Sequence, residues 1–269
     1  MNTARLLKKY GPWAVVTGAS EGIGREFAVS LAAAGFNLVL AARRRDLLNE
    51  LARTLTVNHR IEVKVVAVDL ATAEGVSRLQ AECDALEVGL LVAAAGFGTS
   101  GALLDSKLAD EVQMLEVNCR AVLELSHHFG ARFSKQRRGG LVLLSSLLAF
   151  QGVPRAAHYA ATKAYIQSLA EGLRIELAPY GVDVIASAPG PIATGFARRA
   201  NMQMNLTLTP AVVATATLAA LGHSGTVRPG WLSKLLEWSL ALLPRWGRVR
   251  VLALVMGGMT AHQAKALPT

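Results

Sequence analysis

Short apolar runs alternate along the chain with longer segments whose apolar residues recur at helical spacing. The runs predict buried strands over 13–17, 37–41, 63–68, 88–93, 141–144 and 182–186. The segments between them predict helices, first from the glycine-rich turn at 18–24 to residue 34, then over 45–56, 72–85, 106–134 and 157–178. This alternation predicts an α/β fold, a doubly wound parallel sheet with right-handed crossovers.

Composition favours one globular domain spanning 1–269 in a reducing, cytoplasmic compartment. The chain has 269 residues, 52% hydrophobic and 17% charged, and residues 1–195 contain no repeat or linker. Cys83 and Cys119 have neither disulfide nor metal-ligand spacing, so we expect no metal. Residues 1–10 lack the apolar run of a signal peptide, and no segment has the roughly 18–20 apolar residues of a membrane span.

The net charge of +9 raises the question of an anionic partner. The basic residues are scattered, however, and no module combining aromatic and basic residues is present, so we expect no nucleic-acid binding. Some of these residues have a better use as phosphate ligands.

A glycine-rich turn follows the first predicted strand and opens a helix. Its sequence from Gly18 to Gly24 is GASEGIG, spaced Gly-x-x-x-Gly-x-Gly rather than Gly-x-Gly-x-x-Gly. Glycines in this context permit a tight turn and the close approach of a pyrophosphate to the helix N-terminus. A plain strand–helix connector is the alternative interpretation.

Three arginines, Arg43 to Arg45, follow the second strand, where a doubly wound sheet meets the adenosine ribose. Ala42 stands where an acidic residue would bind the ribose hydroxyls of NAD, and Arg43 is placed to accommodate the 2′-phosphate of NADP. The alternative is a solvated start to the next helix.

Tyr159 and Lys163 are four residues apart in a predicted helix, and Ser146 precedes the tyrosine by thirteen residues. Residues at i and i+4 share a helix face, so the ammonium would lie near the phenol and lower its pKa from about 10. Such a phenol suits proton transfer, and a serine hydroxyl could hold a carbonyl oxygen beside it. Taken alone, this spacing occurs by chance on many helices and favours a solvated pair on a helix face.

Together these motifs resemble the short-chain dehydrogenase/reductase family, which implies a single-domain Rossmann fold binding NAD(P). The resemblance covers roughly residues 12–200: Thr17–Gly24 matches the cofactor motif, Asp69 an adenine-contacting aspartate, and 189–194 the Pro-Gly-x-x-x-Thr loop beside the nicotinamide. The implied catalytic residues are Asn118, Ser146, Tyr159 and Lys163. The cofactor-binding residues expected from the motifs are Gly18, Ser20, Glu21, Gly22, Ile23, Gly24, Arg43, Asp69, Leu70, Ala95, Gly96, Tyr159, Lys163, Pro189, Gly190, Ile192 and Thr194.

The resemblance implies hydride transfer between NADP(H) and a carbonyl or secondary alcohol. Tyr159 would protonate the alkoxide, Lys163 would lower the tyrosine pKa and bind ribose, and Ser146 would polarise the carbonyl. Asn118 would hold a water that links Lys163 to solvent. For three positions a structural role stays open: Asn118 as a surface amide, Asp69 as a helix N-cap, and Thr194 as a turn residue.

Two local features complicate the match. The family commonly has Asn-Asn-Ala-Gly after the fourth strand, whereas this chain has Ala-Ala-Ala-Gly at 93–96, so two amide side chains that hold the sheet and cofactor loop are missing. Ser145 adjoins Ser146, and the thirteen-residue spacing to Tyr159 favours Ser146.

Residues 196–269 are expected to form a variable substrate lid and a C-terminal helical extension. Residues 197–208 contain Met202 and Met204, which suit an irregular apolar pocket or ordinary core packing. An amphipathic helix is predicted over 231–243, stopped or kinked by Pro244 and followed by three arginines and an apolar run to Met256. The stretch 231–256 fits peripheral membrane contact, or packing on the domain or a partner subunit.

The leading prediction is an NADP(H)-dependent oxidoreductase, preferring NADPH to NADH, for a small hydrophobic carbonyl or alcohol substrate. The alternatives are a 3-oxoacyl-thioester reductase and a non-catalytic NADP-binding sensor or scaffold. The resemblance further implies a homodimer or homotetramer, with the helices at 106–134 and 157–178 as candidate interface elements.

Overall fold

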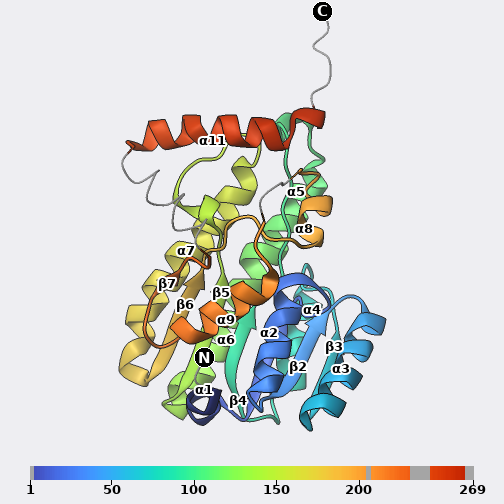
Figure 1. Ribbon diagram of the computed structural model, residues 1–269. Helices are drawn as coiled ribbons and strands as arrows, with labels where there is room; N and C mark the ends of the chain where they lie inside the picture. Colours follow the sequence, from blue (N-terminus) through green and yellow to red (C-terminus); the bar gives the residue numbers. More distant parts are fainter. Residues whose placement is uncertain (1–2, 204–206, 231–242, 264–269) are drawn as a thin grey trace, which may run out of the picture.

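Seven parallel strands form the centre of the molecule (Figure 1). The computed structural model describes residues 3–203, 207–230 and 243–263. The sheet has the order β3-β2-β1-β4-β5-β6-β7. Its strands are β1 (Trp13–Thr17), β2 (Asn37–Ala42), β3 (Val63–Ala67), β4 (Val88–Ala93), β5 (Gly139–Leu144), β6 (Val182–Ser187) and β7 (Thr226–Val227). The order reverses between β1 and β4, which confirms the predicted doubly wound α/β fold.

Helices cover both faces of the sheet and bury its central strands, whereas the edge strands β3 and β7 are partly exposed. Strand side chains alternate between the faces, so Val16 joins one core and Val15 the other. The first core is completed by α1 (Thr3–Tyr10), α2 (Gly22–Ala33), α3 (Arg45–His59) and α9 (Pro210–Ala220). The second is completed by α4 (Ala73–Cys83), α6 (Ala121–Gln136) and α7 (Ala157–Leu177). Burial on both sides explains why the strands are apolar runs.

The helix predicted over 106–134 is interrupted in the structure. It consists of α5 (Leu108–Leu115), a π-helical turn (Glu116–Arg120) and α6. Arg120 bridges the interruption, because its guanidinium pairs with Glu116 on one side and with Glu124, at 2.7 Å, on the other. The turn carries Asn118, which is 1% exposed. π-helical turns inside α-helices frequently occur at functional sites.

The C-terminal region contributes to the sheet and also lies above it. After the short helix α8 (Gly195–Arg199), α9 returns to pack on α2, and β7 completes the sheet edge. Helix α11 (Arg245–Met259) crosses the top of the molecule in Figure 1. The predicted helix over 231–243 falls almost entirely on residues 231–242, outside the described residues. Among the described helices, none is long and apolar enough to cross a bilayer.

Candidate active site

The turn between β1 and α2 depends on glycine at two positions. Gly18 has φ +66°, and a Cβ there would lie 2.9 Å from the backbone of Ala95. A Cβ on Gly24 would lie 2.4 Å from the carbonyl oxygen of Gly18. The turn therefore lies tightly against the loop that follows β4 and leaves the N-terminus of α2 open. This arrangement fits the pyrophosphate of a dinucleotide.

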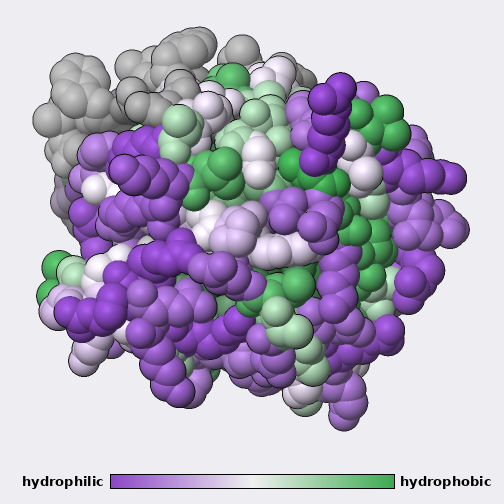
Figure 2. Space-filling view, turned by 90° about the horizontal axis from the view of Figure 1, so that it is seen from below, coloured by the Kyte–Doolittle hydropathy of each residue, from purple (hydrophilic) through white to green (hydrophobic). Residues whose placement is uncertain are grey.

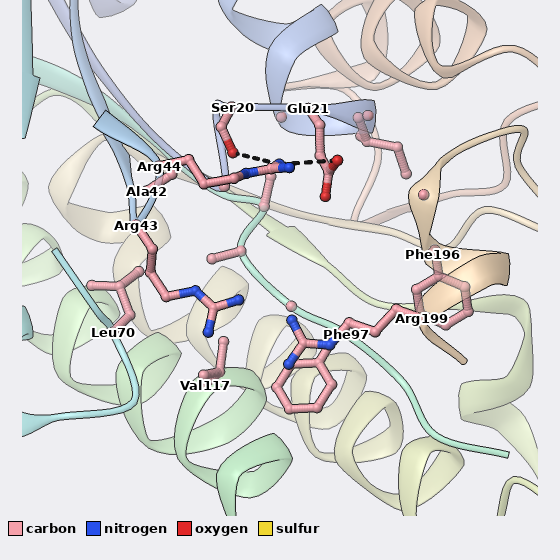
Figure 3. Close-up of a pocket in the computed structure, with 18 of the residues that line it drawn as sticks. Ser20, Glu21, Ala42, Arg43, Arg44, Leu70, Phe97, Val117, Phe196 and Arg199 are labelled. Carbon is pink, nitrogen blue, oxygen red and sulfur yellow. Dashed lines mark hydrogen bonds and ion pairs between the residues drawn. The ribbon is translucent and has the colours of Figure 1, made fainter. Parts of the chain in front are cut away.

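A cleft of about 320 Å³ opens beside this turn (Figure 3). It brings together most of the predicted cofactor residues: Gly18, Ser20, Glu21, Gly22, Ile23, Gly24, Arg43, Asp69, Leu70, Ala95, Gly96 and Thr194. The remaining ones, Tyr159, Lys163, Pro189, Gly190 and Ile192, line a second cavity of about 240 Å³. The two cavities share Ile23, Ala94, Gly96, Phe97, Thr194 and Phe196, and are therefore continuous.

Arginines line the cleft from two sides. Arg44 is engaged with the turn: its guanidinium donates to Ser20 Oγ at 3.0 Å and pairs with Glu21 at 2.9 Å. Figure 3 shows Arg43 directed into the cleft from the end of β2 and Arg199 directed into it from α8. Arg199 has no counterpart in the sequence analysis, because its approach to the cleft depends on how the lid folds back.

The structural alternatives for Asp69 and Thr194 have different outcomes. Helix α4 is capped by Thr72, whose Oγ1 accepts from Gly75 N at 3.0 Å, whereas Asp69 Oδ1 accepts from Ala71 N. Asp69 is therefore not the helix cap. Thr194 does cap α8 by accepting from Phe196 N at 3.2 Å, and it also lines both cavities.

The loop after β4 is held without the asparagines that the family commonly has there. Ala95 N donates to Thr17 Oγ1 at 3.0 Å. Asn118 binds the next part of the loop twice: its Nδ2 donates to Phe97 O at 2.9 Å, and its Oδ1 accepts from Phe97 N at 3.1 Å. Asn118 is thus no surface amide. Thr17 and Asn118 hold the loop where the sequence analysis noted missing amides.

Ser146, Tyr159 and Lys163 converge at the polar end of the second cavity. The phenol and the ammonium are buried, at 8% and 6% exposure, and Lys163 Nζ lies 5.9 Å from the centroid of the tyrosine ring. Lys163 Nζ donates to Leu144 O at 2.6 Å. Ser145 donates to Lys163 O and so supports the helix backbone, which leaves Ser146 as the serine beside Tyr159.

Burial dominates the electrostatics of this group. It raises the pKa of Tyr159 to about 12 although a hydrogen bond with Ser146 acts in the opposite direction. It lowers the pKa of Lys163 to about 8, with Cys119 opposing this shift. The predicted lowering of the tyrosine pKa by the ammonium is therefore not found, because desolvating the phenolate outweighs the attraction of a charge 5.9 Å from the ring.

Beyond these polar groups, the second cavity is strongly apolar. Its other lining includes Leu147 and Leu148 beside the serine, Phe196 and Met202 from the lid, and five residues of α11: Val251, Leu252, Val255, Met256 and Met259. Met202 lines the cavity and also packs in a small buried cluster with Ala160 and Met256, so both interpretations of this methionine hold, whereas Met204 lies outside the described residues. The sequence analysis missed α11 as part of this wall, since an apolar run alone does not indicate what it covers.

Comparison with known proteins agrees with this geometry. The family model for short chain dehydrogenases matches residues 12–205. A 7beta-hydroxysteroid dehydrogenase of Clostridium sardiniense is 34% identical over 187 residues, which are 70% of this chain and 72% of that protein. A very-long-chain 3-oxoacyl-CoA reductase-like protein of Arabidopsis thaliana is 31% identical over 251 residues, which are 90% and 80% of the two chains.

Solved structures extend the similarity over nearly the whole chain. A 7beta-hydroxysteroid dehydrogenase structure has a TM-score of 0.84 and 28% identity, covering 92% of this chain and 98% of its own. Other solved relatives, between 27% and 32% identical, contain NADP or 5-hydroxy-NADP. The chain therefore belongs to the short-chain dehydrogenase family, whose Rossmann fold binds NAD(P), and it is an oxidoreductase acting on CH–OH and C=O groups.

Proposed function

We propose that this protein interconverts a lipophilic ketone and its secondary alcohol, with NADPH preferred over NADH. The observation that carries the proposal is the position of Ser146, Tyr159 and Lys163 at the polar end of an otherwise apolar cavity. That cavity opens into the cleft built around the glycine turn. A substrate carbonyl is the one polar group that such a cavity needs to receive.

Each residue of the polar end has a distinct proposed role. Ser146 Oγ positions and polarises the carbonyl oxygen, and Tyr159 Oη gives its proton to that oxygen as charge develops there. Bound NADPH supplies the hydride to the carbonyl carbon. A tyrosine pKa raised by burial keeps the phenol protonated at neutral pH, so it is ready to donate. The Lys163 ammonium stabilises the phenolate left by this transfer and offers hydrogen bonds to the ribose.

Asn118 is proposed to act beside Lys163 in returning a proton to Tyr159 after the tyrosine has given its own to the substrate. A Cβ on Gly96 would lie 3.0 Å from Asn118 Oδ1 and 3.5 Å from Lys163 Nζ, so the two groups face the same point. A water bound between the two groups would connect the ammonium to solvent, while the two bonds to Phe97 keep the amide in place.

The test is a screen of lipophilic ketones with NADPH, followed by absorbance at the nicotinamide band. We expect turnover by the wild type, and a loss of about 10²–10⁴-fold in kcat for Tyr159→Phe with NADPH affinity unchanged. Full turnover by Tyr159→Phe would reject the tyrosine's role. A biological role that survives in the inactive variant would instead support the sensor or scaffold.

A 3-oxoacyl thioester is the second candidate substrate, favoured by the similarity to the Arabidopsis thaliana protein. Its acyl chain would occupy the apolar cavity, and its phosphate-bearing carrier would remain outside. Including 3-oxoacyl thioesters of increasing chain length in the same screen separates the two classes. A higher kcat/KM for thioesters than for simple ketones of equal length would select the thioester reductase.

The NADPH preference rests on Arg43, which enters the cleft at the end of β2. We expect Arg43→Ala to weaken NADPH binding about tenfold and to leave NADH binding unchanged. Arg45→Ala, which removes an exposed arginine at the start of α3, is the matched control. An unaltered NADPH/NADH preference in Arg43→Ala would exclude its role in binding the 2′-phosphate.

Peripheral membrane contact of a cytoplasmic protein is proposed for the outer side of α11. Trp246 and Leu254 are 63% and 80% exposed there, and the helix carries three arginines and no acidic residue. Hydrophilic residues predominate on the opposite side of the molecule, shown in Figure 2. We expect Leu254→Glu to reduce co-sedimentation with anionic liposomes, and Leu104→Glu, at a leucine 97% exposed elsewhere, to leave it unchanged. Equal binding by both variants would refute contact through α11.

A homodimer or homotetramer is proposed through α5, α6 and α7, the elements predicted from the sequence. They expose apolar side chains, among them Val112, Leu115, Leu123, Tyr165 and Ile175. Light scattering after size exclusion should give an oligomer for the wild type and a smaller species for Leu123→Glu. A monomeric wild type would exclude this assembly.

A further inference from the structure

Arg199 reaches across the cleft from the lid. It is the last residue of α8, and its guanidinium carbon lies 3.5 Å from the centroid of the Phe97 ring. Phe97 itself is fixed, because Asn118 binds both its N–H and its carbonyl. The arginine is thereby held flat against a rigid aromatic surface with its charged group in the cleft, as Figure 3 shows.

No carboxylate of the described residues forms an ion pair with Arg199. In the described part of the chain, Arg44 pairs with Glu21, whereas neither Arg43 nor Arg199 forms an ion pair. Burial and the charge of Arg43 across the cleft both lower the pKa of Arg199, and Asp110, Asp69 and Glu21 oppose them. Two guanidinium groups without ion-pair partners thus face one cavity, an arrangement suited to a ligand with two separate anionic groups.

The lid helix starts beside the glycine turn, which indicates the anion that Arg199 would meet. A Cβ on Gly22 would lie 3.2 Å from the Thr194 side chain, and one on Gly195 would lie 3.3 Å from Glu21 Oε2. Helix α8 therefore begins next to the turn on which a pyrophosphate would rest. Arg43 lies on the far side of the cleft, at the end of β2.

We propose that Arg199 binds the cofactor pyrophosphate from the lid side, opposite the glycine turn, and so fastens α8 over the bound cofactor. This rests on the proposed cofactor site and assigns that site a second cationic wall. Phe196 and Met202, on either side of Arg199 in the lid, line the substrate cavity. The position of α8 would therefore link cofactor binding to one wall of the substrate cavity.

The test measures cofactor affinity by nicotinamide fluorescence, with NADPH and NADH as separate arms. Arg199→Leu should weaken both about tenfold, because both contain the pyrophosphate. Arg199→Lys should recover part of this loss by retaining the charge. Arg53→Leu makes the same charge change at an exposed residue of α3 that lines neither cavity, and should bind as the wild type does.

A second measurement follows the lid directly. Hydrogen exchange of residues 195–203 should slow when NADPH is added to the wild type and should change less in Arg199→Leu. Unchanged affinity in Arg199→Leu, or a loss confined to NADPH, would overturn the assignment, the latter by placing Arg199 on the 2′-phosphate. Failure of the wild type to bind either cofactor would instead reject the proposed cofactor site.

Discussion

The two connected cavities are built in opposite ways. The cofactor cleft consists of strand ends and short turns between residues 18 and 96, closed on one side by the lid, and arginines enter it. The substrate cavity assembles segments from the β4 loop to α11, and apart from its polar end it is apolar. The cleft recognises a ligand through backbone geometry and charge, whereas the cavity recognises one through shape and exclusion of water.

The largest expected difference is between two Gly→Ala substitutions, one in the glycine turn of the cleft and one in α11. Gly24→Ala would place a Cβ 2.4 Å from the carbonyl of Gly18, so we expect a destabilisation of about 3 kcal/mol and loss of NADPH binding. Gly257→Ala, in α11, meets no atom within 4 Å and should stabilise its helix by up to about 1 kcal/mol. Urea unfolding of both variants checks the contrast, and equal effects would contradict it.

Shortening a buried side chain of α11 should weaken substrate binding and leave cofactor binding unchanged. Met256 is 2% exposed and lines the cavity, so Met256→Ala should raise KM for a lipophilic ketone roughly tenfold and lower stability by about 2 kcal/mol. NADPH affinity should stay at the wild-type value. Leu254→Ala, at a side chain 80% exposed on the same helix, is the control and should alter neither quantity. A change in NADPH affinity for Met256→Ala would show that the two regions are coupled.

The same contrast explains what could be predicted from the sequence. The doubly wound parallel sheet could be predicted from the alternation of strands and helices, and the cofactor residues from short motifs at strand ends, such as Gly18–Gly24 or Arg43, and from the family resemblance that these motifs carry. Arg199, Phe97 and the α11 wall were among the residues missed. Each of them reaches its site only after distant segments pack together, as when Arg199 lies on Phe97. Local spacing contains no signal for such a contact.

The tyrosine pKa illustrates a second limit. Helical spacing correctly placed Lys163 near Tyr159, yet the direction of the shift depends on burial, which spacing does not describe. Because Lys163 is buried, the free energy of unfolding should also depend on pH. This dependence tests the polar end of the substrate cavity independently of turnover.

Stability should rise with pH above about 8 because of Lys163. Burial lowers its pKa from 10.5 to about 8, so between these values the unfolded chain binds more protons than the folded one. Stability should therefore increase by about 1.4 kcal/mol per pH unit, or about 2 kcal/mol from pH 8 to pH 9.5. The raised pKa values of Cys83 and Cys119 oppose this from about pH 9, and that of Tyr159 opposes it only above pH 10. The test is therefore the difference in unfolding free energy between the wild type and Lys163→Met, measured by urea unfolding, which should grow with pH by this amount; a parallel pH dependence in both would contradict it.

The smallest expected effect concerns the exposed ion pair at the mouth of the cleft. Arg44 and Glu21 retain 47% and 53% side-chain exposure, so Glu21→Gln should cost less than about 1 kcal/mol in stability. The same change frees Arg44 and removes a negative charge from a cleft that receives phosphates, so NADPH should bind about two- to threefold more tightly, as titration would reveal. Weaker binding would mean that the Glu21 carboxylate itself contacts the cofactor. Tighter binding would show that charges left unpaired in the cleft add to the affinity that the glycine turn provides through its backbone.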